Sequence, residues 1–373
     1  MPEPHAAHRS ALPRPPSRSV LALLAATLLA LPGATPHSRD ADPLRTELVR
    51  WIQYAHDTTA TDHFSRDVKP GSAPVLDRAL EQLNRGRRWY ALHRLAAVYA
   101  DLGAAQRMAT RSKADLSATA FEREHGRLSR QLASDFLPPD STTFARVTPC
   151  ALRAVAEASH LQMRPYFDSS LEYGRNTQPE FGLFYMSAAL AQRDFTVFCR
   201  KLSSPTNRRA PELRSMRPEV DRLQAEMIAE YQPPASVDRH PKFIAASSAL
   251  KEARALDHLG LHHGALLRYL QAVARNAPLR EHPATPTPDS IAAALARYAA
   301  RFASAGTDHS IGELFVQLGQ VDAEAAPETS PPLASAIVSE VLPAYLAALG
   351  PASAARTPFA AVATVTLVRW PFT

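Results

Sequence analysis

The sequence predicts an all-α fold, a stack of antiparallel helix pairs with a short β-strand at the C-terminus. Alanine and leucine recur along most of the chain at the spacing of amphipathic helices. Glycines and prolines fall between these stretches, where helices end. Only 362–368, Val-Ala-Thr-Val-Thr-Leu-Val, is rich in the β-branched residues typical of strands.

The first residues, 1–34, have the pattern of a secretory signal peptide. Arginines precede an apolar run at 20–31, and Pro-Gly-Ala at 32–34 offers small, helix-breaking residues near a cleavage site. The run is short for crossing a bilayer. We therefore expect an exported protein, periplasmic or extracellular, with no transmembrane segment after signal removal. The alternative is an uncleaved anchor.

The charge of the chain argues against nucleic acid as a partner. The formal net charge is +6 over 373 residues, and arginine supplies most of the basic residues. This charge is mild for the length, and nucleic-acid-binding proteins carry a strong, clustered basic surface. We interpret the abundance of arginine, alanine and proline as genomic composition.

The N-terminal helical region, 35–137, begins with a helix at Asp42 and Pro43. Aspartate is a good helix cap, and proline suits the first helical position. The apolar stripe of this helix is Leu44, Leu48, Trp51 and Ala55. The polar stretch 58–71 predicts a loop.

Two further stripes flank Gly86, and Gly103 is expected to end the second of these helices. The stripes are Leu76, Leu80 and Leu83 before Gly86, and Leu92, Leu95 and Val98 after it. Another helix carries Phe121, His125, Leu128 and Leu132, and Pro138 stops it.

The central helical region, 138–281, opens with the cap-and-proline pair Thr148 and Pro149. The stretch 180–202 predicts either one continuous helix or two short helices around 192–194. A narrow stripe in 218–231 predicts one more helix. Its members are Val220, Leu223 and Met227.

A helical hairpin at 246–278 is the clearest element. Gly260 separates two apolar stripes and can end the first helix in a left-handed conformation, while Pro278 closes the second. The stripes are Ala246, Ala249, Leu250, Ala253 and Leu256, then Ala265, Leu266, Tyr269, Ala272 and Val273.

This hairpin resembles one tetratricopeptide repeat. The matching places are Ala253, Leu259, Gly260, Ala265, Tyr269, Ala272 and Pro278. The repeat's early tryptophan is absent, Glu252 takes a large apolar site, and His262 stands where the repeat has a tyrosine. A weaker echo lies at 80–98. The resemblance implies a stacked α-solenoid that binds proteins, because such repeats bury their apolar faces only by stacking. A generic helix pair with a glycine turn is the alternative.

The C-terminal region, 282–373, follows a proline-rich linker at 282–288. Asp289 is expected to cap a helix, and Ser310 with Glu313 fits a capping box. The helix at 333–349 should be kinked at Pro343. The strand at 362–368 needs a pairing partner, which we expect to be another segment of the same chain.

No catalytic, metal-binding or cofactor-binding residue is predicted. His258 and His262 have the spacing of two metal ligands on one helical face, but Gly260 falls between them. Thr-Asp-His occurs twice, with the aspartates at Asp62 and Asp308, and no nucleophile accompanies either. Gly-rich phosphate loops, GxSxG and paired CxxC motifs are absent from the sequence.

The only two cysteines, Cys150 and Cys199, could form a disulfide outside the cytoplasm. Both lie in apolar helical contexts, so two buried free thiols are the other interpretation.

Aromatic residues are concentrated in 166–198, where arginines and carboxylates are interleaved with the first of them. Aromatic side chains beside arginine are typical of peptide or glycan grooves. The candidate partner-binding residues are Arg164, Tyr166, Tyr173, Arg175 and Tyr185. The alternative is an aromatic core between helical layers, and we expect Phe184, Phe195 and Phe198 to point inward.

These observations together predict an exported, non-catalytic helical-repeat protein that binds a protein or peptide. The alternative is a helical enzyme or small-ligand-binding protein whose site lies in the aromatic-rich segment 164–198. A deep polar pocket would favour the alternative, and a broad concave surface would favour a binding scaffold.

Overall fold

The structure is a computed structural model, and its described helices lie between Pro43 and Ala348. It describes residues 42–59, 62–136, 139, 143–175, 178–231, 237–279, 286–325 and 331–350. The predicted signal peptide, most of the predicted linker and the predicted strand at 362–368 lie outside these residues.

The prediction of an all-α fold is confirmed for the described residues, where the only β-type pairing is a single bridge between Arg209 and Thr307. Among the described helices, none is both long and apolar enough to cross a membrane. The short η elements are 3-10 turns, except for the π-helical η4. The elements are α2 (Pro43–His56), α3 (His63–Asn84), α4 (Arg88–Ala109), η1 (Lys113–Leu116), α5 (Ala118–Gln131), α6 (Cys150–Arg175), α7 (Pro179–Leu202), α8 (Arg217–Glu230), η2 (Val237–Arg239), α9 (His240–His258), α10 (His262–Asn276), η3 (Ala277–Leu279), α11 (Pro288–Ser304), α12 (Ser310–Ala325), α13 (Pro332–Ala336), η4 (Ile337–Val341) and α14 (Leu342–Ala348).

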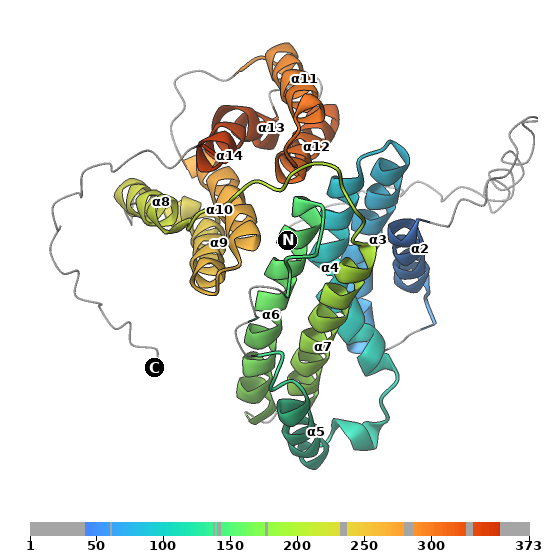
Figure 1. The fold of residues 1–373 in the computed structure, drawn as a ribbon. Coiled ribbons are helices and arrows are strands. Elements are labelled where there is room, and N and C mark those ends of the chain that lie inside the picture. Colours follow the sequence, from blue (N-terminus) through green and yellow to red (C-terminus); the bar gives the residue numbers. More distant parts are fainter. Residues whose placement is uncertain are drawn as a thin grey trace, which may run out of the picture. The chain divides into compact units, whose positions relative to one another are not determined.

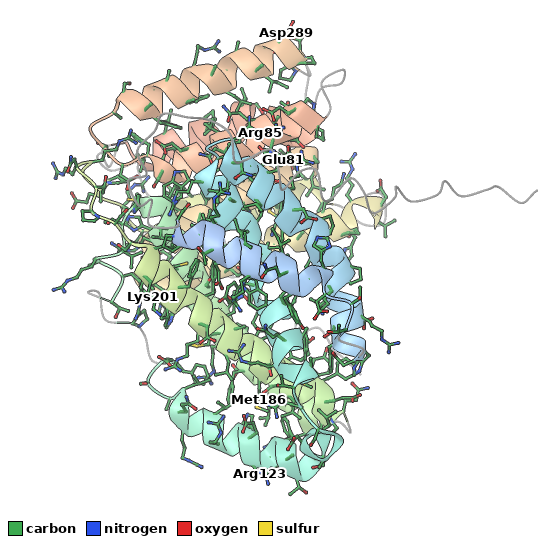
Figure 2. The ribbon with its side chains drawn as sticks, turned by 90° about the vertical axis from the view of Figure 1, so that its right-hand side faces the viewer. Glu81, Arg85, Arg123, Met186, Lys201 and Asp289 are labelled. Carbon is green, nitrogen blue, oxygen red and sulfur yellow. The ribbon has the colours of Figure 1, made fainter. Side chains whose placement is uncertain are left out.

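The helices pack in pairs of sequence neighbours. The most extensive pair is α6 with α7, whose long ribbons lie side by side (Figure 1). Further pairs are α3 with α4, α9 with α10, and α11 with α12. Helices α4 and α10 also pack on the α6–α7 pair, so these helices share a core. A smaller apolar cluster lies where α5 meets α6 and α7, and it includes Phe121 and Met186 (Figure 2).

Gly260 follows a helix end as expected, and Gly86 also lies in a turn between two helices. Gly86 and Gly260 have positive φ angles of 82° and 72°. The amide of Leu261 donates to the Leu256 carbonyl at 2.9 Å, and that of Gly260 donates to the Asp257 carbonyl at 3.0 Å. This pair of bonds is the Schellman arrangement that satisfies the last carbonyls of a helix. The hairpin at 246–278 is therefore confirmed as a helix pair, and all ten residues of its two stripes are buried.

Ala265 lies at the contact between α9 and α10 and is fully buried. We expect Ala265→Trp to lower the free energy of unfolding by about 1–3 kcal/mol, because extra volume in a packed interior forces neighbouring side chains out of position. Urea unfolding measures the change. The matched control is Ala225→Trp on the exposed side of α8. Equal stability of the two variants would contradict the packing described here.

The predicted loop at 58–71 is wrong, because α3 begins at His63 and continues through Pro70 and Gly71. The Asp62 carboxylate accepts a hydrogen bond from the Ser65 amide at 2.9 Å and so caps the helix. Lys69 is buried, and its amine donates to the Asp57 carbonyl at 2.8 Å. The buried face in the first turns of α3 thus includes polar residues, so the stretch up to Gly71 showed no apolar stripe in the sequence.

The predicted helix end at Gly103 is also wrong, because α4 continues to Ala109. A Cβ atom at Gly103 would lie 2.6 Å from the Cβ of Ala191 in α7. The glycine therefore permits a close helix contact rather than a turn. For 180–202 the structure decides between the two alternatives, since α7 is one continuous helix.

The helix predicted at 333–349, with a kink at Pro343, is divided in the structure into α13, the π-helical η4 and α14. The π-helical η4 ends at Val341, and the Leu342 amide donates to the carbonyl of Ile337, five residues back. Proline has no amide hydrogen for the ladder, so a local change in helix type just before it is physically reasonable.

Several predicted caps are wrong, because other residues cap these helices. At α6, the Cys150 amide donates to Asp308 at 2.7 Å and the Ala151 amide donates to Ser310 at 2.8 Å. The Thr148 hydroxyl, expected to cap this helix, instead donates to the carbonyl of Ser204. The expected capping box of Ser310 with Glu313 is not formed, because the Ser310 amide donates to Asp308 and the Glu313 carboxylate accepts from Trp89 and Arg208. At α11 the cap is Thr287, and Asp289 lies in the first turn.

Capping by a residue distant in sequence recurs at four more helix starts. An amide at the start of α4, α8, α10 and α13 donates to a side chain from another element. The pairs are Tyr90 with Gln317 (2.9 Å), Met216 with Asp257 (2.7 Å), Gly264 with Glu157 (2.7 Å) and Ala334 with Asp322 (2.9 Å). These bonds satisfy amides that a helix cannot satisfy by itself, and they fix the helices to one another.

Candidate functional site

The two Thr-Asp-His sequences have structural roles. Asp62 caps α3, and Asp308 joins the starts of α6 and α12 through the amides of Cys150 and Ser310. Burial would raise the pKa of Asp308, but hydrogen bonds from the backbone and side chains of Cys150 and Ser310 outweigh it and hold the pKa below its ordinary value. The ring of His309 stacks on that of Phe302 at 5.1 Å.

The two cysteines are buried free thiols in the structure. Burial, followed by the nearby Asp308 carboxylate, raises the pKa of the Cys150 thiol. Burial also raises the pKa of the Cys199 thiol. Since the thiolate is the nucleophile, neither cysteine is activated for catalysis in this arrangement.

The histidine pair at the hairpin does not form a metal site. His258 ends α9 and His262 begins α10, and His262 Nδ1 lies 3.2 Å from Asp257. The Asp257 carboxylate is already bonded to Ser215 and Met216. Among the described residues, no group of three histidine, cysteine or acidic side chains could hold a metal ion.

The three candidate tyrosines lie together on α6 and α7. Tyr173 and Tyr185 are stacked, with ring centroids 4.8 Å apart and planes at 14°. The ring of Tyr166 lies 6.3 Å from that of Tyr185. Tyr173 is the most exposed of the three, with 39% of its surface open to solvent. We call Tyr166, Tyr173 and Tyr185 the tyrosine cluster.

The two candidate arginines do not join the tyrosine cluster. Arg164 pairs with Asp168 at 2.8 Å, and its guanidinium lies 5.1 Å from the ring centre of Phe136. Arg175 is exposed near the end of α6. At 100° per residue, positions 164 and 175 fall on a different side of α6 from Tyr166 and Tyr173. A groove that uses all five side chains at once is therefore not present.

The phenylalanines nearby belong to the packing of the helices. Phe195 is fully buried, and Phe184 is half-buried with its ring stacked on Phe64 at 4.7 Å. Phe198 is half-buried against the main core. The aromatic-rich segment thus has two parts, a core of phenylalanines and a more exposed row of tyrosines.

A polar cavity of ≈ 390 Å³ lies among α4, α6, α7, α9 and α10, and sequence reasoning did not find it. We call it the arginine cavity. Its lining includes Tyr166, so it adjoins the tyrosine cluster. The lining residues are His93, Arg94, Ala96, Ala97, Val155, Ala158, Ser159, Gln162, Tyr166, Gln192, Glu252, Leu267, Arg268, Gln271 and Arg275.

One sequence signal pointed toward this cavity. Glu252 occupies a site where the repeat-like pattern has a large apolar residue. In the structure its carboxylate pairs with Arg268 at 2.8 Å, and Arg268 also donates to Gln271 at 2.8 Å. The unexpected acid is thus explained by a basic partner on the next helix.

Positive charge dominates the arginine cavity. Burial lowers the pKa of His93 to about 3, and the charges of Arg94, Arg268 and Arg275 act in the same direction. His93 is therefore neutral at physiological pH. Burial also lowers the pKa of Arg268; Glu252 opposes this change, and the charge of Arg275 adds to it. An anion in this cavity would relieve the repulsion between these cations.

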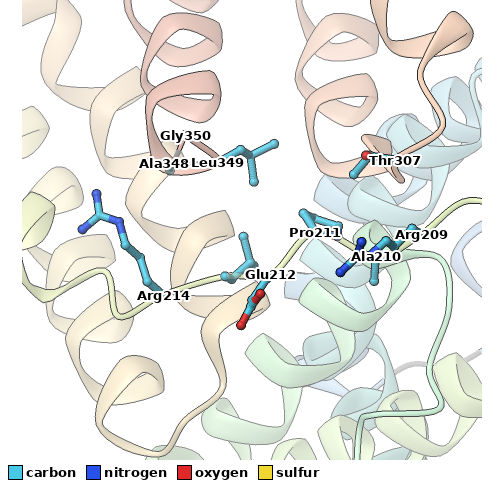
Figure 3. A pocket seen from close by; sticks show the side chains of 10 residues that line it. Arg209, Ala210, Pro211, Glu212, Arg214, Thr307, Ala348, Leu349 and Gly350 are labelled. Carbon is cyan, nitrogen blue, oxygen red and sulfur yellow. The ribbon is translucent and has the colours of Figure 1, made fainter. Parts of the chain in front are cut away.

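A larger cavity of ≈ 620 Å³ is less suited to specific binding (Figure 3). It lies between the segment 209–214 and Ala348–Gly350, the last of the residues that the structure describes. Arg209 and Arg214 lie on opposite sides of it with Glu212 between them, and Arg214 pairs with Glu219. Its charged groups do not converge on one point.

Comparison with known proteins assigns no family. No family model, no curated protein and no solved structure matches this chain. The functional conclusion therefore rests on the residues and geometry described above.

Proposed function

We propose that the protein is exported and non-catalytic, and that it binds a protein or peptide partner through the tyrosine cluster. The export step is supported by the signal-like sequence at 1–34. The stacking of helix pairs supports a scaffold of tetratricopeptide-like type, in which α9 and α10 are the repeat-like unit. On this proposal the C-terminal stretch 362–368 pairs as a strand with another segment of the chain.

The proposal rests mainly on the stacked pair Tyr173 and Tyr185. Tyr173 is exposed and Tyr185 is half-buried. Such an aromatic pair offers apolar ring surface together with two hydroxyl groups, which suits a surface that is wet until a partner binds. Tyrosine is also enriched among residues that dominate binding energy. The pair also joins the packed interior, since Phe184 contacts Tyr185 edge-on at 6.0 Å and itself packs against the smaller apolar cluster.

We expect Tyr173→Ala combined with Tyr185→Ala to weaken partner capture at least tenfold. The loss follows from removal of two ring faces that a partner would cover. The mature chain serves as bait to capture its partner from the secretome or periplasm of the source cells. The captured partner is then titrated against wild type and the variant to measure its affinity. The melting temperature should change little for Tyr173→Ala alone, because 39% of this residue is exposed.

The matched control is Arg164→Ala combined with Arg175→Ala, on the other side of α6. This variant should capture the partner as well as wild type does. Full retention of binding by the tyrosine variant would disprove the proposed surface, and loss of binding only in the arginine variant would move it to the opposite side of the helix.

A further inference from the structure

The arginine cavity has the size and construction of a small-molecule site. Its volume of ≈ 390 Å³ lies in the range of cavities that hold one small organic molecule. Five helices contribute to its wall, so its shape is set by packed elements rather than by loops. Alanine side chains at Ala96, Ala97 and Ala158 line it and keep the space open.

The positive charge in this cavity is not balanced. Arg94, Arg268 and Arg275 line it, and Glu252 is the only acidic lining residue. Glu252 pairs with Arg268. Within the described part of the chain, the printed bonds of Arg94 and Arg275 go to the Tyr90 hydroxyl (3.1 Å) and the Ala245 carbonyl (3.0 Å), neither of which is charged. Two guanidinium groups thus lack a carboxylate partner in the described chain.

Neutral polar side chains complete the lining. Gln192 is only 6% exposed, and its amide oxygen has no hydrogen-bond partner among the described residues. A buried polar atom without a partner costs free energy, which a ligand hydroxyl would recover. Gln162, Ser159 and the Tyr166 hydroxyl offer further donors and acceptors in the same wall.

We propose that the arginine cavity binds a small hydroxylated organic anion. Arg94 and Arg275 hold its anionic group, because guanidinium groups match the oxygens of a carboxylate or a phosphate in pairs. Gln192, Gln162 and Ser159 bind its hydroxyl groups. The site is separate from partner binding at the tyrosine cluster, although Tyr166 contributes to both.

The test is calorimetric titration of the full mature chain with four probes: glucuronate, gluconate, glucose 6-phosphate and glucose. The first two present a carboxylate, the third a phosphate, and glucose has hydroxyls without charge. We expect saturable binding of at least one anionic probe and at least tenfold weaker binding of glucose. The response to the carboxylates relative to the phosphate identifies which anionic group the cavity accepts.

Three variants locate the binding. Arg94→Gln and Arg275→Gln should each weaken binding of the anionic probe at least tenfold. Arg275 is exposed, so its replacement should leave the fold intact. Arg123→Gln, on the outer side of α5 (Figure 2), removes one arginine outside the cavity and should leave binding unchanged. Melting curves without ligand check that each variant is folded.

Three results would overturn the proposal. The first is no saturable binding of any anionic probe, and the second is equal binding of glucose. The third is binding that survives both cavity variants. Because the tyrosine variant tests a different surface, failure here leaves the proposed partner binding unaffected, and the two conclusions can be judged separately.

Discussion

Glu157→Ala is expected to lower the free energy of unfolding by about 3–5 kcal/mol, the cost typical of removing one member of a buried ion pair. Glu157 is fully buried on α6 and accepts hydrogen bonds from Arg153 and from the Gly264 amide, both at 2.7 Å. Alanine would leave that amide unpaired at the start of α10 and open a void between the two helices.

Glu157→Gln separates the two causes of this loss. Burial raises the pKa of Glu157, although hydrogen bonds from Arg153 and Gly264 act in the opposite direction. The charge itself is therefore costly. Glutamine keeps the volume and one acceptor oxygen, which can serve the buried Gly264 amide, and it loses the bond from Arg153. We expect the free energy of unfolding to change by less than about 1.5 kcal/mol for this near-isosteric variant.

The control is Glu122→Ala on the exposed side of α5. It is expected to change the free energy of unfolding by less than about 0.5 kcal/mol. Equal effects of the alanine and glutamine variants at Glu157 would contradict this account.

Asp308→Ala should cost about 2–6 kcal/mol, because it leaves two buried amides without an acceptor at roughly 1–3 kcal/mol each. Those amides belong to Cys150 and Ser310, at the starts of α6 and α12. Chemical unfolding at neutral pH measures the loss. Asp308→Asn keeps one acceptor oxygen and should cost less than the alanine variant.

The pH dependence gives a second measurement for Asp308. Its pKa in the folded protein lies below the ordinary value of 3.8. The folded state therefore binds this proton less tightly than the unfolded state, and the carboxylate stabilises the fold fully above pH of about 4. This contribution disappears as the pH falls through the lower folded pKa. The stability difference between wild type and Asp308→Asn should accordingly shrink in acid; a difference that stays constant from pH 7 to pH 2 would show that Asp308 is not ionised in the folded state.

The sequence predicted the helices best where one helical face is apolar. The stripes of α2, α8, α9 and α10 are all buried. The predictions failed where a helix buries polar or very small residues. Helix α3 buries Ser65 and Lys69, and α4 passes Gly103 at a close contact with α7. In both cases the local sequence pattern resembled a loop or a helix end. The helix continues there because its residues contact other parts of the folded chain, which the local pattern does not show.

For the candidate site, the sequence located the tyrosines but not their surroundings. Composition alone indicated the aromatic-rich segment, and the structure brings Tyr166, Tyr173 and Tyr185 together within it. The helical positions of Arg164 and Arg175 place them elsewhere. The arginine cavity was not predictable, because its charged residues come from α4, α9 and α10 and no local motif connects them.

By itself, the sequence determined the helical class, the glycine turns and the apolar faces, since each depends on residues within a few turns of one another. Only the tertiary structure decided how the helix starts are capped and where unbalanced charge collects. The hydrogen bonds from Cys150 to Asp308 and from Tyr90 to Gln317 join residues 158 and 227 positions apart. Such bonds, and the convergence of the arginines, depend on which helices become neighbours. A backbone amide at a helix start forms its hydrogen bond with whichever acceptor the neighbouring helix places within reach.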